Sequence, residues 1–213
     1  MCNLYDIGPA RHRNRLDWEE IVLEALQKLE KPFGIRKTDP GLVMRSFSGT
    51  PSPEVMRWGF ERDYNPSVNN ARSEKLSGVW AGPWESKRRC LIPVSTFYEW
   101  SGSAGNKQTH AFQPQDNRAF LWMAGLWEDR EDGPAYTMLT RAATGAIAKI
   151  HDRMPVILKE NQFEAFLNEP DPRGLLLEGI TEFETFHCHN PLLKSANHTG
   201  AEARATDMLP GFE

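Results

Sequence analysis

The feature that most constrains the fold of this chain is a series of short strand-like segments between residues 42 and 158. They are rich in apolar, β-branched and aromatic residues, and Gly, Pro, Asn and Asp separate them. The expected strands cover 42–47, 55–60, 90–94, 97–100, 120–126, 136–139 and 156–158. Strands in the middle with helices towards both ends predict an α+β fold, with a curved, mainly antiparallel β-sheet or barrel-like core and peripheral helices. A doubly wound parallel fold fits this order less well.

The clearest helix follows Asp17, which precedes Glu20 at capping-box spacing, while Leu16 can pack onto Ile21. One helical face collects Trp18, Ile21, Val22, Ala25, Leu26 and Leu29. This periodicity predicts a scaffold helix. Later helices are expected from Ala142 to Ile150, from about Glu160 to Leu167, and as a short piece near Leu192 and Leu193.

Length, charge and cysteine content limit the function classes. The 213 residues contain no repeat or obvious linker, so we expect one domain over residues 1–213. No membrane-length apolar run and no secretory signal are visible, and three unpaired cysteines argue against a disulfide framework, so a cytoplasmic location is expected. The formal net charge of −4 implies that any nucleic-acid site is a local basic surface with weak, salt-sensitive binding to intact duplex.

The start of the chain carries an unusual chemical possibility. Removal of Met1 would leave Cys2 with both a free α-amine and a thiol. The amine, with an ordinary pKa of about 7.7 to 8.0, can attack an aldehyde, and the sulfur can then close a five-membered thiazolidine on the imine carbon. An ordinary buried thiol is the alternative, because free cysteine usually behaves as a small hydrophobe.

Three further segments supply polar groups that suit such chemistry. Residues 69–74 combine an amide, a guanidinium and a hydroxyl in a turn-like segment. In residues 89–100, Glu99 stands between aromatic neighbours, where desolvation would raise its pKa and suit it to acid–base work; a structural ion pair with an arginine is the alternative. Residues 150–155 bring a titratable His151 and Arg153 after an expected helix, although they can also form a simple helix cap.

Taken together and in this order, these pieces resemble the SOS response-associated peptidase (SRAP) family, whose members act at abasic sites in DNA. The matching motifs are Met1-Cys2, Asn70-Ala71-Arg72-Ser73-Glu74, Arg89 to Pro93 with Phe97 to Trp100, Ala124 to Trp127, and His151 to Pro155. The resemblance covers most of the chain. It implies a single SRAP-like domain.

The resemblance also implies roles for individual residues. Cys2 would form a covalent thiazolidine crosslink with the abasic sugar, Asn70 would orient the amine or sugar, Glu99 would move protons, and His151 would assist at the sugar and in release. Arg72 and Arg153 resemble the family's phosphate-contacting arginines, and Trp58 and Trp100 its base-stacking aromatics. The implied partner is single-stranded DNA or a single-strand/double-strand junction with an abasic site, and the protein would associate with the nucleoid when bound. Strand cleavage, crosslink reversal and self-removal of Met1 are further activities implied, with no cofactor, metal, membrane or obligate protein partner.

Two segments depart from the family pattern. Asn3 and Leu4 stand where most members carry Gly and Arg, which removes one phosphate-binding arginine. Gly34 to Thr38 lacks the proline of the common Asn-x-Ala-Pro-Thr segment, although Arg36 and Lys37 can restore charge at the same edge. The covalent chemistry should survive both changes.

Other interpretations stay open at this stage. Cys2 can instead be the N-terminal nucleophile of a peptidase or amidase, or the chain can be a non-catalytic reader of modified or damaged DNA. The run from Lys87 to Arg89 can be a solvated surface, and Trp122 and Trp127 suit a core better than a stacking surface. His187-Cys188-His189 lacks a second cluster at zinc spacing, so no metal site is expected.

Overall fold

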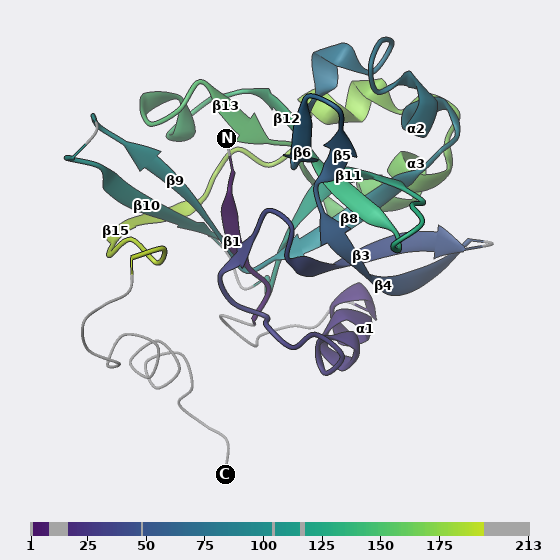
Figure 1. Cartoon of the computed structure of the whole chain (residues 1–213), viewed down its shortest axis with the longest axis horizontal. Helices are drawn as coiled ribbons and strands as arrows, with labels where there is room; N and C mark the ends of the chain where they lie inside the picture. The colour runs from purple at the N-terminus through teal and green to yellow at the C-terminus, as the bar shows by residue number, and fades with distance from the viewer. Residues whose placement is uncertain (1, 9–16, 48, 104, 116–117, 194–213) are drawn as a thin grey trace.

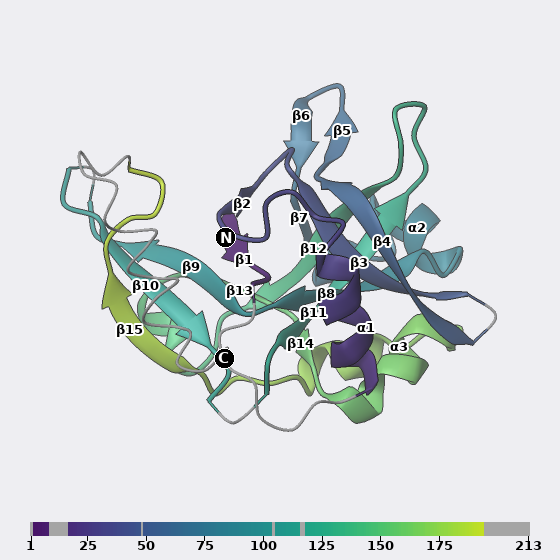
Figure 2. The same ribbon diagram turned by 90° about the horizontal axis from the view of Figure 1, so that it is seen from below.

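The computed structural model describes residues 2–8, 17–47, 49–103, 105–115 and 118–193. It contains an eight-stranded sheet, a five-stranded sheet and a two-stranded hairpin, with short helices at the periphery. Figure 1 shows the five-stranded sheet extending to one side of the larger one, and its strand β1 lies between β9 and the larger sheet in both Figure 1 and Figure 2. The expected α+β class with a sheet-dominated core is confirmed.

The larger sheet closes on itself. Its ring consists of β3 (Pro40–Phe47), β4 (Thr50–Trp58), β8 (Arg89–Val94), β11 (Leu121–Glu128) and β12 (Ala135–Ala142). The pairings run β12–β4, β4–β3, β3–β8, β8–β11 and β11–β12, and only β12–β4 is parallel among these five. Closure removes the two free edges that an open sheet would expose. We call this ring the barrel.

Three short strands extend the barrel at β11 and β12. They are β7 (Asn70–Arg72), β13 (Arg153–Pro155) and β14 (Ile157–Leu158). β7 pairs with β12 in parallel, β13 pairs with β12 antiparallel, and β14 pairs with β11. Strand β12 therefore brings the segments around residues 70 and 153 together, although they are more than 80 residues apart in the sequence.

The barrel interior is apolar and closely packed. Trp58, Tyr136 and Phe120 are 0% exposed, and Trp58 stacks on Tyr136 with ring centroids 6.4 Å apart. The hydroxyls of Tyr5 and Tyr136 form a buried hydrogen bond, and a β-carbon at Gly41 would overlap both of them. Glycine is therefore required at position 41 for the two tyrosines to meet.

Helices cover the outside of the barrel. α1 (Asp17–Leu26) packs on β3 and β4, α2 (Ala81–Glu85) lies against β11, and α3 (Phe163–Asn168) contacts β8 and β3. The predicted helix after Asp17 is confirmed over Asp17–Leu26. Its residues Val22 and Ala25 are buried, as is Leu29, which lies beyond its end. The proposed packing partner Leu16 lies outside the described residues. Single 3-10 turns complete the set: η1 (Ser73–Lys75), η2 (Ile147–Lys149), η3 (Glu160–Gln162) and η4 (Arg173–Leu177).

The five-stranded sheet forms a wing beside the barrel. Its order is β15 (Glu184–Cys188), β10 (Gln108–Gln113), β9 (Thr96–Ser101), β1 (Leu4–Asp6) and β2 (Ile35–Arg36). All four pairings are antiparallel. The base of the wing joins the barrel core through Phe97 and Phe112, whose rings stack 4.7 Å apart.

β5 (Phe60–Arg62) and β6 (Asn65–Val68) form a hairpin. It lies across β1 from the wing strands β9, β10 and β15 (Figure 2). Arg62 binds Glu128 on β11 through two hydrogen bonds of 2.9 and 2.8 Å. Because two parallel bonds fix orientation as well as distance, this pair holds the hairpin in place on the barrel.

Two expected helices are wrong. Residues 142–150 form no α-helix, because Ala142 stays in β12 opposite Arg153, Ala143 extends the ladder to Asp152, and Gly145 has φ +58°. A single 3-10 turn at Ile147–Lys149 follows. The expected piece near Leu192 is a turn, in which the Asn190 side chain accepts a hydrogen bond from the Leu192 amide. No helix in the described part of the chain is long and apolar enough to cross a membrane.

Candidate functional site

Cys2 lies at the seam between the wing and the barrel. It is fully buried, and its carbonyl oxygen accepts hydrogen bonds from Asn70 Nδ2 at 2.8 Å and Asn69 Nδ2 at 3.2 Å. Its thiol is 3.5 Å from the Leu4 carbonyl oxygen. Burial, and secondly the nearby Glu99, raise the pKa of the thiol well above its ordinary value. The sulfur is therefore a neutral thiol, held by a backbone that two asparagines fix in place.

Asn70 is an expected site residue that binds Cys2 directly. It occupies the first position of β7, opposite Met138 in the parallel ladder with β12. Its amide nitrogen binds Cys2, whereas its oxygen Oδ1 is buried and has no partner among the residues that the structure describes. A buried acceptor without a partner costs free energy, on the order of 1–3 kcal/mol. This oxygen can accept a hydrogen bond from an amine or hydroxyl that enters the site.

Glu99 approaches Cys2 from the middle of the wing. It is on β9, where Phe97 pairs with Tyr5, and the same register carried two residues further brings Asn3 opposite Glu99. The side chain is 2% exposed, and its electrostatic effect on Cys2 places the two groups in one neighbourhood. Burial raises the pKa of Glu99 to about 7 against the lowering effect of the chain's α-amine, and Asp152 adds a smaller rise. At neutral pH this carboxyl is divided between its acid and base forms.

His151 precedes β13 and has two competing partners for one ring nitrogen. Its Nδ1 lies 3.0 Å from the Arg153 amide, which can only donate, and 2.7 Å from Asp152 Oδ1. Burial, followed by nearby charges, lowers the pKa of His151, so the ring is neutral at pH 7. A neutral ring that accepts from Arg153 at Nδ1 carries its proton on Nε2 and can donate there. A protonated ring would turn Nδ1–H towards Asp152.

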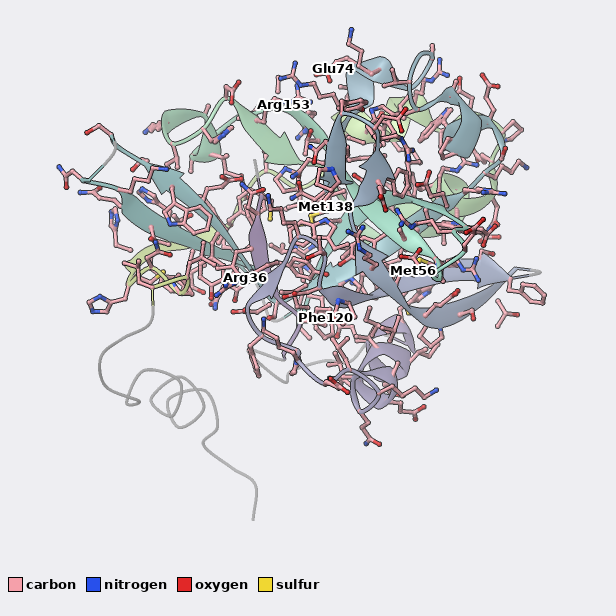
Figure 3. The ribbon with its side chains drawn as sticks, viewed as in Figure 1. Arg36, Met56, Glu74, Phe120, Met138 and Arg153 are labelled. Carbon is pink, nitrogen blue, oxygen red and sulfur yellow. The ribbon has the colours of Figure 1, made fainter. Side chains whose placement is uncertain are left out.

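Arg153 differs from the expectation of a phosphate contact. It is 8% exposed, and its guanidinium binds both carboxylate oxygens of Glu74, at 2.6 and 2.9 Å, and the Thr140 carbonyl at 2.7 Å. Figure 3 labels Glu74 and Arg153 near one another at the upper edge of the molecule. The pair joins the segment of residues 70–74 to that of residues 151–155. Arg153 therefore supports the site from inside, whereas Arg72 on β7 is exposed.

The two expected stacking tryptophans also differ from one another. Trp58 is 0% exposed, donates its Nε1 hydrogen to the Asn69 carbonyl at 2.9 Å, and packs edge-on against Tyr5. It supports the asparagine that holds Cys2 and has no surface for a base. Trp100 is partly exposed, beside Leu4 and Tyr98. The exposed aromatic nearest to Trp58 in the sequence is Tyr64, which is 76% exposed in the β5–β6 hairpin.

Two groups of basic residues lie outside the seam: Arg36, and the run from Lys87 to Arg89. Arg36 is exposed directly opposite Leu4 in the β1–β2 ladder, and Figure 3 labels it at the lower edge of the wing. In the run from Lys87 to Arg89, Lys87 and Arg89 donate to the Asn168 and Glu169 carbonyls at the end of α3, and Arg88 lies over Trp127. Two of these three cations thus complete a helix end, which is a structural use.

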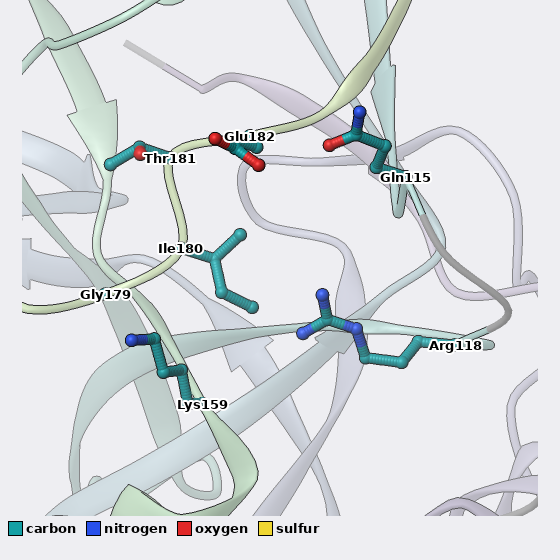
Figure 4. Close-up of a pocket in the computed structure, with 7 residues that line it drawn as sticks. All are labelled: Gln115, Arg118, Lys159, Gly179, Ile180, Thr181 and Glu182. Atoms are coloured by element: carbon teal, nitrogen blue, oxygen red, sulfur yellow. The ribbon is translucent and has the colours of Figure 1, made fainter.

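A separate hollow of about 420 Å³ is lined by the segments that follow β10 and β14 and by the segment before β15. Figure 4 shows Arg118 and Lys159 on one side of it and Gln115 and Glu182 on the other. None of the expected site residues lines it. Within the described residues, no group of three or more His, Cys, Asp or Glu side chains has the geometry of a metal site.

The chain is similar to known proteins over nearly all of its described length. The model of the family described as SOS response associated peptidase (SRAP) matches residues 1–190. Among solved structures, a protein from Bordetella bronchiseptica superposes with a TM-score of 0.69 at 23% identity, covering 89% of this chain and 100% of that one. A protein from Bacteroides thetaiotaomicron superposes with a TM-score of 0.67 at 18% identity, covering 92% and 95%. These structures show that the fold is shared.

Curated relatives match over a shorter span. The abasic site processing protein YMR114C of Saccharomyces cerevisiae is 29% identical over 139 residues, which are 60% of this chain and 37% of the relative. The abasic site processing protein YoqW of Bacillus subtilis is 33% identical over 133 residues, 57% of this chain and 58% of the relative. The abasic site processing protein HMCES of Gallus gallus is 30% identical over 138 residues, 48% of this chain and 41% of the relative. The matches thus span between 37% and 58% of these relatives' own length.

Proposed function

Because this chain belongs to the SOS response associated peptidase family, we propose that it processes abasic sites in DNA and captures the sugar aldehyde through Cys2. The relatives named above are abasic site processing proteins, and this supports the substrate class. The finer proposal is a thiazolidine crosslink, formed in single-stranded DNA or at a single-strand/double-strand junction. Reversal of the crosslink and strand cleavage through the same imine belong to this proposal.

The observation that carries the proposal is the clamp on Cys2. Two asparagine side chains bind its carbonyl, and a carboxyl with a pKa of about 7 stands in the same neighbourhood. Once Met1 is removed, Cys2 carries a free α-amine on the residue that these asparagines bind. The buried Asn70 Oδ1, which has no partner within the described part of the chain, can then accept from this amine or from a sugar hydroxyl.

The raised pKa of the Cys2 thiol favours an order in which the amine reacts first. The amine nitrogen bonds to the aldehyde carbon and gives a carbinolamine. Glu99 in its acid form protonates the hydroxyl, which leaves as water, and the imine forms. The nitrogen of this imine still carries one hydrogen and a positive charge. The sulfur then bonds to the imine carbon while the thiol proton passes to the Glu99 carboxylate, which leaves a neutral thiazolidine ring. One water is released, and Glu99 ends in its starting form.

The remaining site residues act around this bond. His151, with its proton on Nε2, donates to a sugar oxygen and assists reversal. Arg72 is exposed two residues beyond Asn70 and binds a backbone phosphate, and Trp100 offers a partly exposed ring to a neighbouring base. Arg153 and Trp58 hold Glu74 and Asn69 in place, and act on the site through them.

A second candidate is a peptidase reaction at Cys2, which the family's description favours. The narrowest form is cleavage of the Met1–Cys2 bond. The two asparagines donate to the carbonyl of Cys2, one residue beyond the scissile carbonyl, and the thiol is neutral. Both observations support the crosslinking activity more than thiolate attack. Intact mass of Glu99→Ala and His151→Ala chains separates the two, because self-cleavage requires that Met1 be retained in them.

The decisive test uses the processed protein and single-stranded DNA with one abasic site. We expect an adduct that survives denaturation, with the mass change on the Cys2 peptide, and no such adduct from Cys2→Ala. Cys90→Ala is the matched control, because Cys90 is also a fully buried thiol with a raised pKa. Reversible binding that salt fully dissociates would instead assign the protein as a non-catalytic reader.

A further inference from the structure

We propose that His110 and His187 carry protons between buried Glu99 and solvent, so that His110 acts through Glu99 during the covalent step. The inference rests on the proposed function, because it concerns the proton that Glu99 gives and takes while a sugar is captured or released. The path runs across the wing, away from Cys2.

The three side chains form one row across three neighbouring strands. His110 on β10 is directly opposite Glu99 on β9, and directly opposite His187 on the edge strand β15. Directly paired residues project from the same face of a sheet, with β-carbons about 5 Å apart. Figure 1 shows β9, β10 and β15 side by side in the wing. The row therefore begins at the candidate site and ends at the outer edge of the sheet.

The His110 ring is held in this row by two contacts. Its Nε2 is 2.7 Å from the Ser101 hydroxyl oxygen, and its ring centroid is 4.5 Å from that of His187. His110 is 8% exposed, whereas His187 is exposed. Burial, and secondly His187, lower the pKa of His110, so its ring is neutral at pH 7. A neutral imidazole can accept a proton at one nitrogen and release one from the other.

The proton path is needed because Cys2 and Glu99 are buried. Cys2 and Glu99 are 0% and 2% exposed before any DNA is bound, and a sugar bonded to Cys2 would cover the seam further. Glu99 must still return to its starting protonation state when proton donation and acceptance fall in different steps, as in crosslink reversal or strand cleavage. The histidine row supplies a route that the bound strand does not block.

The proton balance is simple. When the Glu99 carboxylate needs a proton, one passes to it from His110 through a bridging water or the Ser101 hydroxyl, and His110 receives one from His187, which takes it from solvent. The reverse direction removes a proton. No other reactant is consumed.

The titratable groups that act on the pKa of Glu99 are the chain's α-amine, which lowers it, and Asp152, in the segment before β13, which raises it. Glu99 in turn acts on the thiol of Cys2. His110 is the titratable group opposite it on β10. Replacement of His110 should therefore change how the reaction rate responds to pH, while Cys2 and Asp152 stay in place.

The test measures adduct formation and reversal under single-turnover conditions, with saturating single-stranded abasic DNA, between about pH 5.5 and 8.5. His110→Phe keeps a planar ring but removes both nitrogens. We expect its first-order rates to fall roughly tenfold, with a changed pH profile, unchanged DNA affinity and partial recovery in added imidazole. His187→Gln should lose less, because water can replace a group at the edge. Thr109→Val is the matched control: Thr109 is equally buried on the same strand, projects from the opposite face, and should leave the rates unchanged.

Two outcomes would overturn the proposal. In one, His110→Phe reacts within about twofold of the parent at every pH. In the other, its rates fall equally at all pH values and imidazole restores nothing, which assigns His110 a structural role. If His110→Phe does not fold, His110→Gln replaces it, judged by the same two outcomes. A parent protein that forms no adduct at Cys2 contradicts the proposed function instead, so the two failures are distinguishable.

Discussion

The barrel and the wing are both β-sheets, yet they place their polar groups differently. The barrel buries aromatic and aliphatic side chains, and its buried tyrosines, Tyr136 and the adjoining Tyr5, bind one another. The wing buries Glu99 and His110, and Asp6 accepts from the Tyr98 hydroxyl at 2.6 Å. A closed sheet packs one continuous interior, whereas the open wing has room for polar groups on its faces. The barrel therefore supplies the apolar core, and the seam supplies the polar groups of the proposed site.

The two fully buried thiols make the same point. Burial raises the pKa of both Cys2 and Cys90. The second-largest influence on Cys2 is the Glu99 carboxyl, whereas for Cys90 it is the Arg45 guanidinium. Glu54, the carboxylate that acts on Cys90, is paired with Arg45, and Cys90 packs inside the barrel against Gly125. Burial alone does not make a site.

The largest expected effect comes from Glu99→Gln in the wing. Loss of an acid–base group should lower the first-order rate of adduct formation by about 10²- to 10⁴-fold, with DNA affinity unchanged. The parent rate should fall as the pH rises through the Glu99 pKa of about 7, because the reaction begins with Glu99 in its acid form. Single-turnover kinetics from about pH 5.5 to 8.5 measures both. Glu128→Gln in the barrel is the control and should react at the parent rate.

The same substitution should stabilise the fold at high pH. Burial raises the folded-state pKa of Glu99 from its ordinary 4.5 to about 7, so the folded chain holds this proton more tightly than the unfolded chain does. The stability that Glu99 contributes is fully present below about pH 4.5 and is lost as the pH rises through 7. At pH 8 the free energy of unfolding of Glu99→Gln should therefore exceed that of the parent by on the order of 1–3 kcal/mol. The variant should accordingly unfold at a higher denaturant concentration. Equal stability of both proteins at that pH would contradict the claim that burial raises the pKa of Glu99.

Arg153→Ala tests the junction of the two regions, and should have the next largest effect. It removes two bonds to Glu74 and one to the Thr140 carbonyl from a buried position. The free energy of unfolding should fall by about 3 kcal/mol, and adduct formation should slow because residues 70–74 and 151–155 lose their link. Urea unfolding measures the first effect. Lys31→Ala, which breaks an exposed ion pair with Asp39, is the control and should cost less than about 1 kcal/mol.

Much of the barrel could be predicted from the sequence, because alternating apolar residues and turn residues mark strands locally. Closure could not, since the parallel β12–β4 pairing joins segments about 80 residues apart and leaves no local signal. The strand–helix error at 142–150 has the same origin: β12 continues because β13 pairs with it, and an apolar run fits a helix equally well.

For the site, motifs predicted which residue types gather, but not which way they face. Asn70 and Glu99 lie near Cys2 as the resemblance implied. Trp58 and Arg153 point inward, because their polar groups find partners in Asn69 and Glu74, and a motif does not record that choice. His110 escaped notice because a lone histidine carries no periodic or spacing signal, and only the pairing of β9 with β10 sets it opposite Glu99.

Arg72→Gln should have the smallest effect, and it sharpens the contrast between a cation on the seam surface and one inside it. Arg72 is exposed and can neutralise one phosphate, whereas Arg153 already binds Glu74. Each phosphate contact to a single strand contributes about −0.7 to the slope of log K against log salt, so Arg72→Gln should make this slope shallower by about that amount. Fluorescence anisotropy with undamaged single-stranded DNA at several salt concentrations measures it without any covalent step. Lys159→Gln, beside the separate hollow, should leave the slope unchanged; an equal change in both variants would mean that affinity follows net charge and not a strand path across the seam.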